Sequence, residues 1–596
     1  MIQTHLSSPA IALESLVATA PPTPTQTGKS FFQWNFVIHK WLGLFAAVWL
    51  AILGLTGFFL DHPTWRWQVQ NKAPTWLTTQ ALEKNANRNP VRLLQVDPND
   101  PAIRLAGGPR GLWFSRDGGN SWQSTEFAKG DHPQTFAIEP DPALGWKRIW
   151  FATDDGIYVS DDAGQTARAA TLHGEMISSL TAGAQAQEMV GVIEQSRVFR
   201  FNTSEPVQVT SIKLSPLSVQ ARPEDVQVSR FMRELHFGTG VADPLSSLLM
   251  NDLGGIGMFI LSVTGLLYWA LPKYWKVQAK SRSQSGSGHP NSNSEQTLKA
   301  AKAATKKATI LWLFRTHSVT LGIASVLMLI YLSVTGIFVG HGRELGDWMR
   351  ATRIDQMYLP PAFSLKSWDG RIDAIVAYPG SPQTLSIGNR YGLFTTTDAG
   401  QSWTRELGSD GTPLNSAARL RRLGDTVLVP NGMAGPSVIQ SADKVSHTVA
   451  AKEDRSTRTA MDHSQHKGAG GTDRALVESG ERALKKRGKS EVAGEGSEMG
   501  GMGNMFMPSD VTRIGENFAW KSSGKLLVTD ASGREIEKLE IKQPIDPGVP
   551  WFTWFLRLHM GTIFWSEWKW INDLFSVVAV VLSVTGLIRW WRKKWA

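Results

Sequence analysis

Six of the 13 histidines in this chain stand at matching places in two similar stretches of sequence. They form three pairs: His39 with His317, His62 with His341, and His236 with His559. Neutral imidazole is a common ligand of transition metals and of haem iron. One histidine beside an apolar segment is more often an interfacial polar residue. Recurrence in both stretches favours metal ligands, because ionisable groups in such places are costly and tend to be functional.

The rest of the composition limits which metal group these histidines could hold. The chain has no cysteine, which excludes thiolate sites, iron–sulfur clusters and covalently attached haem. Zinc prefers four clustered ligands, and the apolar segments contain no H-E-x-x-H. Haem needs only two axial ligands, and helices with small residues can enclose its apolar ring. The sequence therefore predicts non-covalent haem b, in two or more copies.

We expect one haem between His39 and His317. At least one more should be held among the remaining four histidines, on the opposite side of the membrane. Three arginines precede histidines closely in the sequence: Arg233, Arg315 and Arg557. They could pair with haem propionates, and they could equally serve as interfacial anchors.

Four apolar runs must position these histidines: Trp41–Phe59, Ile256–Ala270, Ile323–Val339 and Leu574–Ile588. Each reaches about 20 residues with its flanks, enough to cross a bilayer core of roughly 30 Å. Each run contains or closes on one word, LGLTG in the first and LSVTG in the others, and tryptophans gather near their ends as in an interfacial belt. We expect a duplicated four-helix transmembrane bundle. The Thr-Gly pair would serve either helix packing or the close approach of a flat ligand.

The charge pattern predicts the orientation. The segment between the second and third runs is rich in Lys and Arg and has one acid, Glu295, so it should be cytoplasmic. The net charge of +10 then comes largely from residues that set the orientation in the membrane, and it does not indicate binding of nucleic acid. We expect a multi-pass protein of a bacterial inner membrane with large periplasmic segments.

The expected order is a cytoplasmic tail (1–32), helix 1 (33–61), a periplasmic β-rich segment (62–232), an LHxGT motif with helix 2 (233–272), a basic cytoplasmic loop (273–312), helix 3 (313–341), a second periplasmic β-rich segment (342–550), an LHxGT motif with helix 4 (551–591) and a cytoplasmic tail (592–596).

The two periplasmic segments carry turns of a known type. SRDGGNSW (Ser115–Trp122) and TTDAGQSW (Thr396–Trp403) fit the Asp-box S/T-x-D-x-G-x-x-W of sialidase-like propellers, and SDDAGQTA (Ser160–Ala167) is a degenerate copy. We assign Asp117 and Asp398 to the turns, and we expect no catalytic residue. Each segment holds about three strand pairs, so the two together could close one propeller-like β-domain. The fold class is an α + β membrane protein.

The second segment contains a polar, glycine-rich insertion at 441–509, which we expect to be disordered. It includes MDHSQHKG (Met461–Gly468) and MGGMGNMFM (Met499–Met507). A solvated linker is the plainer interpretation, but such His and Met tracts suit soft metals such as Cu(I). Copper therefore stays open as an alternative substrate.

The repeated order of His, Thr-Gly, Leu-His-x-Gly-Thr and LSVTG-x-x-x-Trp resembles the PepSY-associated transmembrane family, which includes inner-membrane ferric-siderophore reductases. The resemblance covers the four apolar runs and their entry motifs. It implies haem held by bundle histidines and electrons passed to a periplasmic ferric chelate. By motif position the axial ligands would be His39, His236, His317 and His559, with His62 and His341 as weaker candidates. The Asp-box segments replace the PepSY-type modules of relatives.

The sequence thus predicts a haem protein that passes electrons from the cytoplasmic side to a periplasmic ferric siderophore or other metal chelate, as in iron uptake. The basic loop is too short for a flavin or nicotinamide domain and lacks G-x-G-x-x-G. A separate donor is required, either a cytoplasmic reductant or a membrane quinol. The alternative is a membrane-anchored propeller-type binding or scaffolding protein without redox activity. A transporter is disfavoured, because the runs show no broken helix or buried acid.

Overall fold

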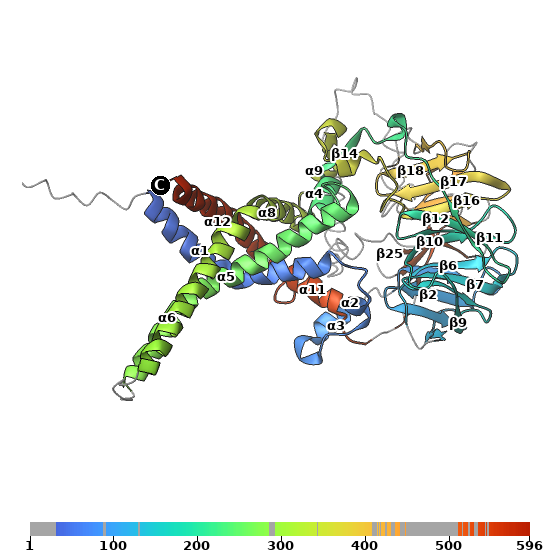
Figure 1. Ribbon diagram of the computed structural model, residues 1–596. Helices are drawn as coiled ribbons and strands as arrows, with labels where there is room; N and C mark the ends of the chain where they lie inside the picture. The colour runs from blue at the N-terminus through green and yellow to red at the C-terminus, as the bar shows by residue number, and fades with distance from the viewer. Residues whose placement is uncertain are drawn as a thin grey trace, which may run out of the picture.

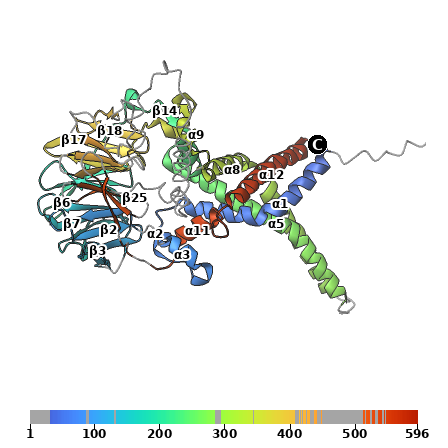
Figure 2. The ribbon, with the colours of Figure 1, turned by 180° about the vertical axis from the view of Figure 1, so that it is seen from behind.

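The computed structural model describes residues 31–86, 91–128, 132–284, 293–342, 344–407 and 547–595, with short stretches between 414 and 544. Two units lie side by side in both views: a group of long apolar helices and a β-domain (Figures 1 and 2). The chain passes from the helices to the β-domain and back twice. The β-domain is therefore assembled from two separate parts of the sequence.

Three helices in the described part of the chain are long and apolar enough to cross a membrane, through their segments Gln33–Leu60, Pro244–Ser281 and Lys569–Trp591. They belong to α1 (Phe31–Leu60), α5 (Pro244–Gln284) and α12 (Lys569–Trp595). A fourth span would be a bent pair of helices that meet at 62°. The pair consists of α6 (Asn293–Phe314), η3 (Arg315–Thr320) and α7 (Leu321–Ala324) on one side of the bend and α8 (Val326–Gly340) on the other.

The bend corrects the expectation of unbroken spans, and the sequence offers a reason for the irregular turn before it. His39 lies 17 residues before Thr56, whereas His317 lies 18 residues before Thr335. The second stretch therefore holds one extra residue. A π-helical turn accommodates one extra residue in a helix, and η3 is such a turn. The residues of the predicted loop 273–312 also differ from expectation, because α5 and α6 extend through most of them.

Helices α1 and α5 cross at two glycines. A Cβ on Gly54 would lie 2.5 Å from the carbonyl oxygen of Gly255, and a Cβ on Gly255 would lie 3.0 Å from that of Gly54. Small residues of this kind let two apolar helices pack backbone to backbone.

Replacing Gly54 by Ala should push α1 and α5 apart, since the opposing atom is backbone and cannot rotate away. We expect a loss of stability of about 1–3 kcal/mol, typical of overpacking. A lower melting temperature in detergent measures it. Gly340→Ala is the matched control, because its added Cβ would meet nothing within 4 Å. Equal melting temperatures for the two variants would contradict this description of the crossing.

Short helices lie between the apolar helices and the β-domain (Figure 1). Two of them, α4 (Val228–His236) and α11 (Trp551–His559), end on a histidine. Helices α2 (Arg66–Gln70), α3 (Gln80–Ala86) and α9 (Gly346–Ala351) also lie there. The remaining short helices are η1 (Thr75–Leu77), η2 (Val219–Ala221), η4 (Gln356–Tyr358) and η5 (Pro361–Ser364).

Among the described residues the β-domain contains six sheets of four or five strands, each built from consecutive strands. Three come from the first segment: β1–β4 (Leu93–Val96, Arg104–Gly108, Gly111–Ser115, Gln123–Ser124), β5–β9 (Glu126–Phe127, Thr135–Asp141, Gly145–Thr153, Gly156–Ser160, Thr166–Thr171) and β10–β13 (Ile177–Ala182, Glu188–Ile193, Arg197–Asn202, Val209–Ile212). Three come from the second: β16–β19 (Ala374–Tyr378, Ser381–Asn389, Gly392–Thr396, Thr404–Arg405), β20–β23 (Arg421–Leu423, Thr426–Pro430, Pro436–Gln440, His447–Thr448) and β24–β27 (Val511–Ile514, Asn517–Ser522, Lys525–Thr529, Glu535–Glu540). A two-stranded ribbon of β14 (Asp225–Gln227) and β15 (Arg353–Asp355) joins the two segments.

The six sheets form a closed ring. β6 contacts β1 and β10, β10 contacts β16, and β20 contacts β24, which returns to β1. The remaining step, from β16 to the β20–β23 sheet, is made by a shared core of Val376 and Tyr378 with Val427 and Val429. Ring closure leaves each sheet only short edges. This arrangement is propeller-like, and each segment contributes three sheets of four or five strands. The sequence predicted that the two segments together close one such domain, but with about three strand pairs in each, fewer than the structure has.

The three Asp-box turns join the third and fourth strands of their sheets, or β8 and β9 in the five-stranded one. Asp398 accepts hydrogen bonds from the backbone N–H groups of Gln401 and Ser402, at 3.0 and 2.8 Å. The hydroxyl and the backbone N–H of Ser402 contribute most to holding the pKa of Asp398 well below its usual range. Asp117 and Asp162 make the corresponding bonds. The structural role assigned to Asp117 and Asp398 is confirmed.

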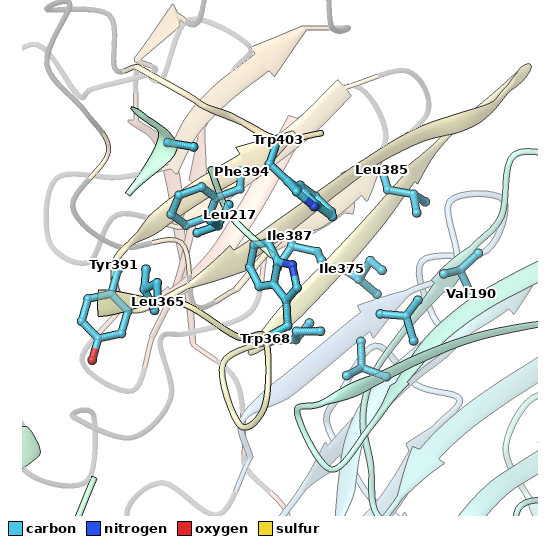
Figure 3. Close-up of a cluster of buried hydrophobic side chains, with 14 of the residues drawn as sticks. Val190, Leu217, Leu365, Trp368, Ile375, Leu385, Ile387, Tyr391, Phe394 and Trp403 are labelled. Carbon is cyan, nitrogen blue, oxygen red and sulfur yellow. The ribbon is translucent and has the colours of Figure 1, made fainter. Parts of the chain in front are cut away.

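The largest hydrophobic cluster lies between the last sheet of the first segment and the first sheet of the second (Figure 3). Trp403, the last residue of an Asp-box, packs there on Trp368 with ring centres 4.8 Å apart. Both indole N–H groups donate to the carbonyl of Ser215. The cluster therefore fastens the two segments to each other.

Of the insertion predicted at 441–509, the structure describes only β23. The two His and Met tracts lie outside the described residues.

Candidate functional site

Each of the four Thr-Gly pairs contacts one histidine. The threonine Oγ1 lies within hydrogen-bond distance of the imidazole Nδ1 in the pairs Thr585–His39 (2.9 Å), Thr264–His317 (3.2 Å), Thr335–His236 (3.2 Å) and Thr56–His559 (2.9 Å). In every pair the threonine and the histidine come from different halves of the chain. The four contacts therefore tie the halves together in a reciprocal pattern.

The threonine bonds fix the tautomer of each imidazole. Every one of these hydroxyls donates its proton to the carbonyl four residues earlier, for example Thr264 to Ile260 at 2.6 Å. The hydroxyl oxygen can then only accept, so Nδ1 must carry the proton. For His317 the carbonyl of Leu261, 3.0 Å from Nδ1, requires the same. Nε2 is thereby left with a free lone pair, the state of a metal-binding histidine.

The glycine of each pair makes room for the same ring. A Cβ on Gly265 would lie 3.0 Å from Cε1 of His317, and one on Gly336 would lie 3.2 Å from Cε1 of His236. A Cβ on Gly586 would lie 3.4 Å from Cε1 of His39, and one on Gly57 would lie 3.5 Å from Cε1 of His559. The recurring word LSVTG thus has two functions: Thr orients an imidazole and Gly accommodates it.

The four oriented histidines face each other in two pairs. The ring centres of His39 and His317 are 6.3 Å apart, and those of His236 and His559 are 6.4 Å apart. The first pair joins α1 to η3, and the second joins the ends of α4 and α11. Within the described residues no group of three or more His, Asp or Glu side chains could hold a metal ion. A group that brings its own remaining ligands suits such pairs better than a bare ion.

The structure places His62 and His341 apart from these pairs, each beside an aspartate. His341 Nε2 lies 2.6 Å from Asp573 Oδ2, and His62 Nε2 lies 3.6 Å from Asp252 Oδ2. Sequence reasoning missed the aspartates and the asparagines before them. Asn251 donates to the carbonyl of His236 at 2.8 Å, and Asn572 donates to that of His559 at 3.0 Å. The signal that could have found them is the Asn-Asp dipeptide, which stands near the start of α5 and again near the start of α12.

The predicted arginines lie in different surroundings. Arg315 is exposed, whereas Arg557 is buried and donates to Thr562 at 3.3 Å. Arg233 is partly buried, and its charge acts on Glu234. Sequence reasoning missed Arg589, whose charge acts on both His39 and His317. Arg589 is therefore a further candidate for pairing with an acidic group of a bound cofactor.

A buried ion-pair cluster fixes the helix that ends in His236. Glu234 is only 1% exposed and lies 3.1 Å from Arg390, in the turn between β17 and β18. Arg230 lies 3.7 Å from the same carboxylate. Burial alone would raise the pKa of Glu234, but Arg390 and Arg230 outweigh it and lower the pKa to about 2. The β-domain thus anchors one histidine of the second pair through a charge.

Replacing Thr264 by Val keeps the shape of the side chain and removes one of the two acceptors for His317 Nδ1–H, the other being the carbonyl of Leu261. Loss of a group that hydrogen-bonds the non-ligating nitrogen of a ligand histidine usually costs 10–100-fold in metal affinity. We therefore expect cofactor binding at the first pair to weaken about tenfold or more. Titration of the purified apoprotein with the cofactor measures it. Thr305→Val is the control, because Thr305 bonds only its own exposed helix. Unchanged affinity in Thr264→Val would contradict the orienting role.

No curated protein matches the chain. Two solved structures align loosely with it. An ancestral GH74 enzyme aligns at 10% identity and a TM-score of 0.25, over 60% of this chain and 32% of that chain, so the alignment spans about a third of the enzyme. The β-propeller domain of Cps50 (Swd1) from Myceliophteria thermophila aligns at 9% identity and a TM-score of 0.29, over 77% of this chain and 88% of that one.

The apolar helices, the matched histidines and the Thr-Gly pairs extend over both halves of the chain. A family match covers the same extent, residues 36–593. This membrane protein belongs to the family of the PepSY-associated TM region.

Proposed function

We propose that the protein is a haem b electron-transfer protein of a bacterial inner membrane, with one haem between His39 and His317 and a second between His236 and His559. Its apolar helices form a duplicated four-helix bundle, and its β-domain lies in the periplasm. It passes electrons to a periplasmic acceptor, a ferric siderophore or another metal chelate, as in iron uptake.

One observation carries the proposal: the separation of the paired imidazoles. Two metal–imidazole bonds of about 2 Å, with about 1 Å from each bonding nitrogen to its ring centre, give roughly 6 Å between ring centres. The observed separations are 6.3 and 6.4 Å. The protonation agrees, because the threonine bonds leave Nε2 of every neutral ring without a proton.

The residues around the pairs fit a large, flat, acidic cofactor. The four glycines let the imidazole rings lie close to the helix backbones. The charge of Arg589 acts on both imidazoles of the first pair, and Arg557 is buried two residues before His559 of the second, so each could pair with a carboxylate of the cofactor. When bound, haem iron supplies one-electron transfer. The protein contributes ligand orientation, burial and nearby positive charge, which together set the reduction potential.

The two histidine pairs occupy different ends of the helices. His39 lies early in α1, while His559 contacts Thr56 near the end of α1. From residue 39 to residue 56 an ideal helix rises about 25 Å, most of the apolar thickness of a bilayer. Two haems at these places would form a relay between the membrane faces. The donor is a separate molecule, a cytoplasmic reductant or a membrane quinol.

The experiment is a dithionite-minus-air spectrum of the purified protein, followed by anaerobic addition of a ferric chelate. We expect the Soret and α bands of a reduced b-type haem, and their return to the oxidised form as the chelate is reduced. A protein without a Soret band would instead be a membrane-anchored binding or scaffolding protein. Bands that persist in the presence of the chelate would rule out chelate reduction while leaving haem binding intact.

A further inference from the structure

The His62–Asp252 pair differs from its counterpart in the second half in a way that points to a missing hydrogen-bond donor. In the second half, His341 Nε2 and Asp573 Oδ2 are 2.6 Å apart and form a direct hydrogen bond. In the first half, the corresponding atoms of His62 and Asp252 are 3.6 Å apart, beyond hydrogen-bond range.

The protonation of His62 explains why the gap stays open. Its Nδ1 lies 2.9 Å from the carbonyl oxygen of Phe58. A carbonyl can only accept, so Nδ1 carries the proton and Nε2 of the neutral ring is itself an acceptor. Two acceptors, Nε2 and a carboxylate, therefore face each other.

The carboxylate of Asp252 lacks a donor on its other oxygen as well. Oδ1 of Asp252 is buried and has no hydrogen-bond partner within the described part of the chain. Buried polar atoms nearly always have partners, and one without a partner points to a ligand or a solvent molecule. The pair is suited to receive a hydroxyl that donates its proton.

The surroundings of the pair are partly aromatic and partly apolar. Trp65 stacks on His62 with ring centres 4.3 Å apart and an interplanar angle of 29°. Leu249 and Ile256, three residues before and four after Asp252, share its helix face and are 52% and 37% exposed. A lipid-soluble molecule with a hydroxyl-bearing aromatic ring matches these contacts.

The pair also has a neighbouring proton acceptor and a link to the second histidine pair. Burial raises the pKa of Asp61 to about 7, and the charge of Asp252 contributes. Asn251 bridges Asp61, at 3.0 Å, to the carbonyl of His236, at 2.8 Å. A proton accepted at Asp252 therefore has a second group that can hold it near neutral pH.

We propose that His62 and Asp252 form the binding and deprotonation site for a membrane quinol, the electron donor that the proposed function requires. One quinol hydroxyl donates to Asp252 and His62, and its ring stacks against Trp65. Overall, one quinol gives two electrons to two ferric chelates and becomes quinone. The proton of the bound hydroxyl passes to the His62–Asp252 pair and then to water outside the bundle, and the proton of the second hydroxyl, across the ring, passes to water directly. The proposal rests on the proposed function for the fate of the electrons, but not for the binding of the quinone ring.

The test uses the full-length purified protein and decylubiquinone as the probe. Calorimetric titration with decylubiquinone measures binding without any electron transfer, and reduction of the bound haem by decylubiquinol is followed at the Soret band. Asp252→Asn and His62→Gln should slow quinol-dependent reduction by about a hundredfold, the usual scale for loss of a positioned proton acceptor. Dithionite should still reduce the haem fully in both variants.

Asp573→Asn is the matched control, since it changes the corresponding aspartate of the second half, and it should keep wild-type binding and rate. Wild-type rates in Asp252→Asn and His62→Gln, or equal loss in Asp573→Asn, would overturn the proposal. A wild-type protein that dithionite reduces but decylubiquinol does not would overturn it while leaving the proposed function in place. A protein without haem that still binds decylubiquinone through Asp252 would retain the quinol site and contradict the proposed function.

Discussion

Replacing His39 or His317 by Ala should remove one of two bound haems and leave the other in place. The reason is the pairing: these two imidazoles face each other at 6.3 Å, and each is oriented by its own threonine. His236→Ala and His559→Ala should each remove the second haem. Each variant should therefore hold half of the wild-type haem, measured as haem per chain after extraction.

The combinations make this expectation sharper. The double variant His39→Ala/His317→Ala should lose no more haem than either single variant. The double variant His39→Ala/His236→Ala should lose all the haem. His62→Ala and His341→Ala are the controls, and they should keep the full content because these histidines lie beside aspartates. Full haem in the four ligand variants, or loss in the two controls, would contradict the pairing.

Replacing Glu234 by Gln should strongly destabilise the protein. The carboxylate is 1% exposed and balances the charges of Arg390 and Arg230. Arg230 is mostly buried, whereas Arg390 is 38% exposed and keeps Asp373 at 3.7 Å as a second partner. We therefore expect a cost of about 1.5–3 kcal/mol, the usual range for losing a hydrogen bond to a charged group. The melting temperature measures the effect. Asp225→Asn is the control, because the Asp225–Arg353 pair is exposed and should contribute less than about 1 kcal/mol.

The same carboxylate gives a dependence of stability on pH. The pKa of Glu234 is about 2 in the folded protein and about 4.3 in an unfolded chain. Because the folded value is the lower one, the stabilisation is complete above about pH 4.3 and is lost as the pH falls toward 2. The difference in melting temperature between wild type and Glu234→Gln should therefore be smaller at pH 3 than at pH 7. A constant difference between them would contradict the ion-pair account.

The sequence predicted much of this architecture because repetition is visible without a structure. The four apolar runs, the matched histidines and the Asp-box turns all recur, and each has a local physical cause. The closure of both segments into one propeller-like domain was predicted, but the count of about three strand pairs in each segment was too low, since several strands are only two residues long. The exchange of contacts between halves, such as His39 with Thr585, joins residues 546 positions apart, and periodicity within one helix cannot reveal it.

Other features lay beyond sequence reasoning for specific reasons. The function of Thr264 depends on which side chain faces it across a helix interface, and helix packing explained the residue equally well. The π-helical turn η3 accommodates a single extra residue, which is easily overlooked when two short motifs are aligned by eye. The His62–Asp252 distance is about one ångström longer than the His341–Asp573 distance. The sequence cannot show this difference, because each aspartate follows an asparagine in the same way.

The most direct test of the account is the haem content and spin state of the purified wild-type chain. Extraction and quantification should give two haem b per chain, and electron paramagnetic resonance of the oxidised protein should show low-spin iron with two imidazole ligands at both sites. A chain that binds no haem, or whose iron is high-spin with a single histidine ligand, would contradict the assignment of the four threonine-bound histidines.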